Sequence, residues 1–328
     1  GQAVAVFFLA SVLSAQQITV NRIEQMPNLP QPYQMRNWKQ VALGYDSLVF
    51  DFNRTGQELP LVWLNTNTVN YPSHNSFGLH TVVGTTDPHS SEAINVIPAV
   101  VGATLAGVDK SNQNGYNWVL MCEEYFNRRT AENVYLNHPS STSGDDWWYD
   151  TMPNVFFYEL YSQYPGTGDF NYQFTTIAGR WLQAVKAMGG NAAPWHVPNM
   201  DHRAWSLSTM KPNDNGVHEP EASGAIAWLL YNAYVKSGEA RYRMGAEWAM
   251  EFLNGLSINP AYELQLSYGT YLAARMNAEL GTTYDIAKLV NWCFDVAPLR
   301  QWGAVVGKWG SYDCSGLIGE VNGSNDYA

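Results

Sequence analysis

Residues 234–248 read YVKSGEARYRMGAEW, which has the form of a helix end, a glycine turn and the start of a second helix. Gly238 supplies the left-handed residue at which helices commonly end, and the helix that opens near Tyr242 then packs back antiparallel on the first. The same order of tyrosine, glycine and tryptophan recurs at residues 164–181 and, in part, at 281–292. Helical hairpins repeated at this pitch predict an array or a closed toroid.

The hydrophobic pattern on both sides of this stretch is helical as well, and strand signals are sparse throughout. A six-hairpin toroid needs about twelve helices. Fewer are visible, so we expect the C-terminal part of the domain to be missing. The helices are predicted at about 38–52, 91–107, 116–129, 149–164, 170–188, 221–237, 240–255, 262–280 and 284–296.

The N-terminal residues predict export. Residues 1–15 hold a short apolar run followed by small residues, as in a clipped secretion signal, and the alternative is a buried N-terminal helix. Such a run is too short to cross a bilayer, and no cysteine follows it to carry a lipid anchor. We expect residues 16–37 to form an extended lead-in and residues 38–328 to form the toroidal domain.

Composition excludes some partners and leaves others open. The net charge is −11, with 18 Lys and Arg in 328 residues, so no basic footprint for nucleic acid is present. Aromatic residues reach 14%, including 13 Trp and 20 Tyr. Such rings either fill a large core or stack on sugars in a cleft. The three cysteines are too widely spaced to indicate a disulfide framework or a metal site.

The richest candidate site is residues 144–154, which read GDDWWYDTMPN at the start of a predicted helix. Acids four residues apart share a helix face, and apolar rings beside a carboxyl group raise its pKa, as a general acid requires. The alternative is an acidic first turn favoured by the helix dipole, which leaves the rings unexplained. The acids and rings are Asp145, Asp146, Trp147, Trp148, Tyr149 and Asp150.

Two further segments combine histidine with charged residues. His218, Glu219 and Glu221 open another helix, where they either satisfy its dipole or bind sugar hydroxyls. His202, Arg203 and Trp205 lie in a loop, as a surface ion pair or as a site for a carboxylated sugar. Neither segment has the spacing of metal ligands, and neither do His74 and His80, so no metal or cofactor is expected.

Residues 150–158, DTMPNVFFY, resemble the six-hairpin glycosidases, most closely the unsaturated glucuronyl and rhamnogalacturonyl hydrolases. Those proteins carry an Asp followed by small, Met and Asn residues at the start of an inner helix. The resemblance implies that Asp150 is the general acid/base. Residues 222–231 resemble the later Arg-Gly-Gln-Ala-Trp helix of the family, with Ser223 in place of Arg and Ala225 in place of Gln.

Together these patterns predict an all-α fold, an (α/α)6-toroid of helical hairpins incomplete at its C-terminus. We expect a bacterial glycoside hydrolase, periplasmic or extracellular. It would act on a plant or microbial polysaccharide or its oligosaccharides, uronic-acid-containing ones among them. Asp150 is the expected general acid, and Asp146 or Glu221 the second carboxylate. The expected substrate-binding residues are Asp145, Trp147, Trp148, Asn154, His202, Arg203, Trp205, His218 and Glu219.

Two other functions fit the same residues. A polysaccharide lyase on a similar scaffold needs a Tyr or His base beside a charge-neutralising group, and Tyr149, His202 and Arg203 are candidates. A non-catalytic glycan-binding protein keeps the tryptophan platform without a working acid. The sequence gives neither the sugar and its linkage nor the oligomeric state.

Overall fold

A computed structural model of the chain describes residues 17–26, 35–57, 59–80 and 91–321. The predicted secretion signal, residues 1–15, lies outside these ranges, as do part of the lead-in and the last seven residues. The α-helices are α1 (Trp38–Val49), α2 (Ala93–Leu105), α3 (Trp118–Met121), α4 (Trp147–Gln163), α5 (Phe170–Ala187), α6 (Ala222–Ser237), α7 (Ala240–Gly255), α8 (Gln265–Leu280) and α9 (Ile286–Trp292).

Short strands pair into two-stranded antiparallel sheets between and after these helices. The pairs are β1 (Val62–Asn65) with β2 (Ser76–Leu79), β3 (Asn191–Ala192) with β4 (Trp195–His196), β5 (Ala204–Ser206) with β6 (Lys211–Asn213), β7 (Trp302–Ala304) with β10 (Ile318–Glu320), and β8 (Lys308–Trp309) with β9 (Tyr312–Asp313). Two 3-10 turns, η1 (Ile23–Gln25) and η2 (Cys122–Tyr125), complete the described elements.

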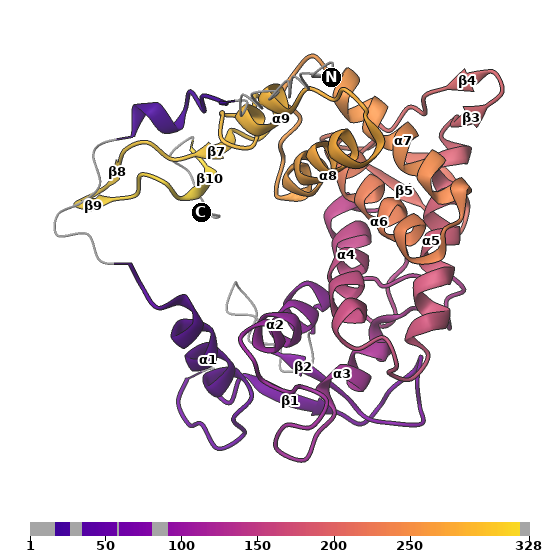
Figure 1. Ribbon diagram of the computed structural model, residues 1–328. Helices are drawn as coiled ribbons and strands as arrows, with labels where there is room; N and C mark the ends of the chain where they lie inside the picture. The colour runs from indigo at the N-terminus through magenta and orange to yellow at the C-terminus, as the bar shows by residue number, and fades with distance from the viewer. Residues whose placement is uncertain (1–16, 27–34, 58, 81–90, 322–328) are drawn as a thin grey trace, which may run out of the picture.

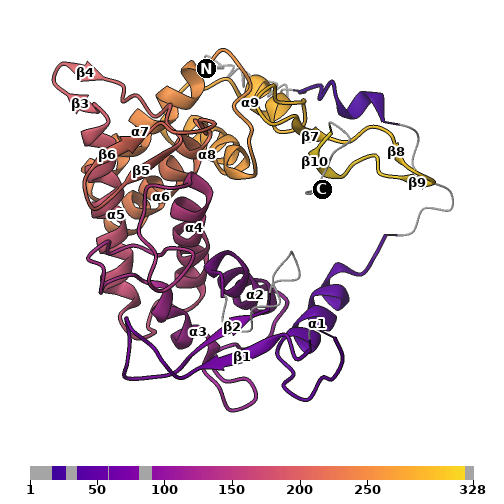
Figure 2. The ribbon, with the colours of Figure 1, turned by 180° about the vertical axis from the view of Figure 1, so that it is seen from behind.

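The helices follow one another around an arc (Figure 1). Helices α2, α4, α6 and α8 contact each other in that order, and α5 and α7 lie outside α4 and α6. Seen from behind, residues 17–26 lie beside α9 and the C-terminal strands, so both ends of the described chain meet at one side (Figure 2). Asn21 N–H bonds to Asn291 Oδ1 at 3.1 Å in that contact.

The predicted glycine turns are confirmed at two hairpins. Gly238 ends α6 with φ 73° and Gly281 ends α8 with φ 70°, the left-handed region that a glycine enters without a Cβ penalty. Each cap N–H bonds back to a helix carbonyl, that of Tyr234 in the first case and Asn277 in the second. The turns send α7 and α9 back along their partners, as the repeat predicts.

Some aromatic residues of the repeat lie in the core, as the pattern predicts, whereas Tyr172 is 58% exposed. Tyr242, Trp181 and Trp248 are at most 1% exposed. They join one continuous hydrophobic cluster that runs through α2, α4, α5, α6, α7 and α8. The three cysteines form no disulfide, which agrees with their wide spacing, and Cys122 is fully buried.

The predicted all-α fold and six-hairpin toroid are wrong. The described residues contain nine helices, one of them a single turn, together with five small antiparallel sheets, so the architecture is mixed α and β. Nine helices are too few for six hairpins. Strands of two to four residues are too short to show a readable alternation. The helix predicted at 116–129 is also shorter than expected, because an α turn passes into η2 by Cys122.

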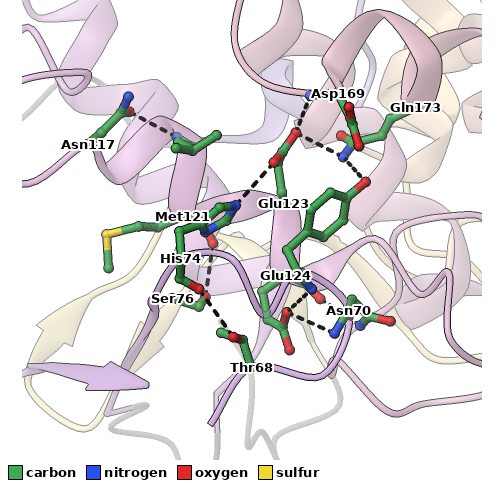
Figure 3. Close-up of polar contacts among 12 residues, drawn as sticks. Thr68, Asn70, His74, Ser76, Asn117, Met121, Glu123, Glu124, Asp169 and Gln173 are labelled. Carbon is green, nitrogen blue, oxygen red and sulfur yellow. Dashed lines mark hydrogen bonds and ion pairs between the residues drawn. The ribbon is translucent and has the colours of Figure 1, made fainter. Parts of the chain in front are cut away.

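Two buried acids fasten the segment before β2 to η2 (Figure 3). The carboxylate of Glu124 accepts the backbone N–H groups of Val69, Asn70 and Tyr71 at 2.6–3.1 Å. Glu123 accepts from the Asp169 N–H at 2.5 Å and lies 3.2 Å from His74 Nε2. The bonds to Glu124 satisfy backbone donors that the segment between β1 and β2 would otherwise bury unpaired.

Candidate active site

A cleft of about 700 Å³ opens between the start of the inner helices and the C-terminal strands. It is called the central cleft below. Its walls come from α1, the first turns of α2 and α4, residues 262–264 and residues 300–302. Aliphatic, aromatic and charged side chains all contribute to them. The aromatic side chains are Tyr45, Trp148, Tyr149, Tyr262 and Trp302.

A second hollow of about 520 Å³, called the acid pocket below, adjoins the central cleft. The two share Glu92, Asp146 and Tyr149 as lining residues. The acid pocket also holds hydrogen-bonding groups from residues 137–142. Among the described residues, five carboxyl groups line the two hollows together: Glu92, Asp145, Asp146, Asp150 and Glu263.

The sequence places Asp146 at this junction because Asp146 is the N-cap of α4. Its backbone is extended, and its Oδ1 accepts the Trp148 N–H at 2.8 Å, as capping aspartates do. Its Oδ2 accepts from Arg203 Nη2. These two bonds hold the Asp146 carboxylate in place at the mouth of both hollows.

Asp150 lies one turn further along α4 and faces the acid pocket with only 4% of its surface exposed. Its Oδ2 accepts the Gly144 N–H at 2.8 Å, and its Oδ1 has no hydrogen-bond partner among the described residues. Burial raises the pKa of the Asp150 carboxyl well above its usual range, the Gly144 bond opposes this, and the charge of Asp146 adds to it. Asp150 is thus a buried carboxyl group with a raised pKa beside the arginine-paired Asp146.

Arg203 brings the three sequence segments together. Its guanidinium lies between the carboxylates of Asp146 and Glu219, one bonded to each side. Glu219 is fully buried, and burial raises its pKa to about 9, with the charge of Asp146 adding to the effect and Arg203 opposing it. The segments 144–154, 199–205 and 215–224 therefore meet, as a shared site requires.

Glu221 holds the scaffold instead of lining the cleft. It is fully buried, and its two carboxylate oxygens accept the N–H groups of Glu263 at 2.7 Å and Leu266 at 3.3 Å, at the start of α8. Burial raises its pKa to about 7, against those backbone bonds. The carboxylate thus positions residues 262–264, which line the central cleft.

Several predicted binding residues are buried in the framework around the site. Trp147 donates its indole N–H to the His202 carbonyl at 2.9 Å and is fully buried, as is Asn154, whose amide bonds the backbone of Tyr135. His202 lies between Asp214 and the Asn199 carbonyl. Trp205 is 3% exposed.

The more exposed candidates divide between the cleft and the loop beside it. Trp148 and Tyr149 line the central cleft, and Tyr149 is 40% exposed. Asp145 is exposed at the rim of the acid pocket. His218 lies outside both hollows, 3.1 Å from Asp201 Oδ1.

The cleft contains functional candidates that the sequence pattern missed. Glu92 is the N-cap residue of α2, and both its carboxylate oxygens accept amide donors, from Asn95 and Asn137, at 2.9 Å. Arg300 and Trp302 come from the strand region, which was read as the end of a helix array. An acid just before an apolar helix was the available signal for Glu92, since Asp146 occupies the same position before α4.

A separate apolar pocket of about 440 Å³ lies between α4, α5 and α6. Its walls include Tyr158, Phe174 and Trp228, and its one carboxylate is Glu159, which accepts from Tyr268 Oη at 3.2 Å. Acid/base chemistry on a glycosidic bond uses two carboxyl groups. The central cleft with its acid pocket is therefore the better candidate.

Comparisons with protein-family models, with curated proteins and with solved structures found no match to this chain. Across the described ranges, no three or more metal-ligating side chains gather in a way that could hold a metal ion. No helix among the described residues has both the length and the apolar character needed to cross a bilayer. Function therefore has to be inferred from the site itself.

Proposed function

We propose that this protein is a secreted bacterial glycoside hydrolase that cleaves a plant or microbial polysaccharide or its oligosaccharides in the central cleft. One observation carries this proposal. A buried Asp150, whose carboxyl pKa is raised by burial, and Asp146, which is paired with Arg203, line the same acid pocket one helical turn apart. Carboxyl groups whose environments push their pKa values apart divide acid and base roles between them.

Asp150 is the proposed general acid. Its Oδ1 has no partner among the described residues, so it is free to deliver a proton to the leaving-group oxygen of a sugar in the acid pocket. Asp146 is the second carboxylate, which would activate water or stabilise the positive charge that develops on the sugar ring. Arg203 pairs with the Asp146 carboxylate, whereas burial raises the pKa of the Asp150 carboxyl.

The aromatic side chains of the central cleft supply the binding surface. Trp148, Tyr149 and Trp302 line it, and flat rings with a polar handle suit the apolar face and hydroxyl edge of a sugar. Trp147, which the sequence predicted as a sugar-binding residue, is not part of this surface because its ring is fully buried. A volume of about 700 Å³ lies within the range of ordinary ligand sites.

The test is the substitution Asp150→Asn, assayed by release of reducing ends from a panel of polysaccharides. Asn keeps the shape and the bond to Gly144 but cannot donate the proton, so turnover is expected to fall about 10²–10⁴-fold with binding retained. Asp169→Asn, at an exposed acid before α5, is the matched control and keeps full turnover.

Each other outcome has a definite meaning. Full turnover in both Asp150→Asn and Asp146→Asn contradicts the site assignment. Binding without turnover by the unmodified protein makes it a glycan-binding protein. Products that carry a new double bond instead of a hydrated end indicate a lyase.

A further inference from the structure

The charges around the cleft are strongly one-sided. The described residues that line the central cleft and acid pocket include five carboxyl groups, of which Asp146 and Glu263 are paired with arginines and Asp150 has a raised pKa. The cationic or titratable nitrogen groups among the same described lining residues are the guanidinium of Arg300 and the imidazoles of His80 and His138. The donors to Glu92 are the neutral amides of Asn95 and Asn137, so they leave its charge uncompensated.

The guanidinium of Arg300 is already used within the protein. Its Nη1 lies 2.7 Å from Glu263 Oε1, and its Nε lies 2.7 Å from Glu320 Oε1. Its plane also stacks near two rings, 4.6 Å from the Tyr262 centroid and 5.2 Å from that of Trp302. Both edges that would grip a ligand carboxylate in a bidentate pair therefore face internal carboxylates.

The same holds for the other arginine close to the site. Arg203 is clamped between Asp146 and Glu219 and is mostly buried. A site that binds a carboxylated sugar needs a cation with free hydrogen-bond donors. Without one, the carboxylate of the sugar is repelled by the carboxylates of the site. Neither Arg203 nor Arg300 offers that cation.

We propose that the cleft selects glycans without carboxylate groups, either uncharged or bearing protonated amines, and rejects uronic acids. This inference rests on the proposed hydrolase site and narrows its substrate class. Sugar hydroxyls donate hydrogen bonds to Glu92, Asp145 and Asp146 without bringing in charge. A uronate brings a negative charge among those same acids, and in a partly dry cleft such repulsion is poorly screened.

The experiment uses matched pairs of polysaccharides. Neutral glucans, mannans and galactans are compared with the same polymers after oxidation of C6 to carboxylate, so linkage and chain length stay constant within a pair. Binding to the full chain is measured at about 20 mM and about 500 mM salt. For any polymer that binds, the oxidised form should bind about tenfold more weakly or worse at low salt, with a smaller ratio at high salt.

A charge variant tests whether the cleft itself causes the discrimination. Glu263→Gln removes one carboxylate, and with it the counter-charge of Arg300, so the ratio between oxidised and neutral polymer should fall several-fold. Glu239→Gln removes the same charge from an exposed ion pair with Arg241, at the start of α7, and should leave the ratio unchanged. Equal effects of the two variants would point to net charge alone and overturn the inference.

The outcomes separate this inference from the proposed hydrolase activity. Oxidised polymers bound as tightly as neutral ones, or cleaved preferentially, overturn the charge rule and leave the hydrolase proposal standing. Neutral polymers bound selectively but never cleaved support the charge rule and refute the hydrolase. Absence of binding to every member of the panel contradicts both.

Discussion

At the scale of single residues, two aspartates one helical turn apart have opposite environments. Asp146 caps α4 and pairs with Arg203, whereas Asp150 is buried with one backbone donor. The sequence pattern alone treats them as equivalent acids on one helix face. Only the fold decides which of them loses its solvent, and that loss is what distinguishes a general acid from its partner.

Asp150→Asn should change how stability depends on pH. The raised pKa of Asp150 in the folded protein means that its contribution is fully favourable below about pH 4 and is lost as pH rises toward the folded value. Asparagine does not titrate. The variant should therefore gain stability relative to the unmodified protein as pH rises above about 4, as followed by chemical unfolding.

The exposed control Asp169→Asn should show no such pH-dependent gain. A stability difference between Asp150→Asn and the unmodified protein that is flat with pH would mean that Asp150 is ionised in the folded state. That result would also remove it as the general acid.

At the scale of elements, a buried ion pair fastens α1 to the rest of the molecule. Lys110 is fully buried, with its Nζ 2.8 Å from Asp46 Oδ1 and close to the face of Phe50. Burial lowers the pKa of Lys110 to about 8, against the pull of Asp46. Since α1 forms one wall of the central cleft, this pair positions Tyr45 as well.

Asp46→Asn should destabilise the protein by about 3–5 kcal/mol at pH 7, because it leaves the Lys110 ammonium buried without a counter-charge. The loss should shrink above about pH 8, since the depressed folded pKa lets Lys110 deprotonate there while the unfolded chain still binds the proton. Urea unfolding at several pH values measures both effects. Asp51→Asn, in an exposed pair with Arg54, should cost no more than about 1 kcal/mol.

Helices α6 and α8 approach each other closely at a pair of glycines. A Cβ placed on Gly224 would lie 2.9 Å from the Gly269 Cα, and one on Gly269 would lie 2.7 Å from the Gly224 Cα. Gly224→Ala should therefore force the helices apart and cost about 1–3 kcal/mol.

Gly179 is the matched control for that substitution. It lies within α5 with nothing inside 4 Å of its added Cβ, so Gly179→Ala should stabilise by about 1 kcal/mol through helix propensity. Thermal unfolding compares the two. A neutral Gly224→Ala would show that α6 and α8 have room to adjust.

At the scale of the whole molecule, the sequence predicted the local turns between helices but not the way in which the elements are arranged. The turns at Gly238 and Gly281 could be predicted because a left-handed glycine at a helix end is a local feature of the sequence. Strands such as β7 and β10 carry three residues each and gain their stability from a partner sixteen residues away, which no local period reveals. The all-α prediction failed for that reason.

The candidate site divides in the same way. Residues 145–150 were found because acids and rings stand together in sequence. Glu92, Glu263 and Arg300 were missed because they come from distant segments, each with an ordinary local role as a helix start or a surface charge. Three inner helices carry an acid at the N-cap, namely Glu92, Asp146 and Glu221. The shared position of these acids points to a common site only once the structure shows that the three helix starts lie close together.

The meeting of the two ends of the described chain supports the wall of the cleft. Arg22 Nε donates to the Ala304 carbonyl at 2.9 Å, and Asn291 Nδ2 donates to the Thr19 carbonyl at 3.0 Å. Ala304 belongs to β7, the strand that also carries Trp302 into the central cleft. Residues 17–26 therefore brace a binding surface from which they are distant in sequence.

Arg22→Ala should loosen that wall without unfolding the helices. Loss of the bond to Ala304 lowers the free energy needed to open β7 and β10 locally, so their amides should exchange hydrogen faster, about five- to tenfold for a loss of about 1 kcal/mol. Exchange in α6 and α7 should stay unchanged. Arg54→Ala, which removes another paired arginine, serves as the control. Unaltered exchange in β7 after Arg22→Ala would show that the bond from Arg22 does not stabilise this strand.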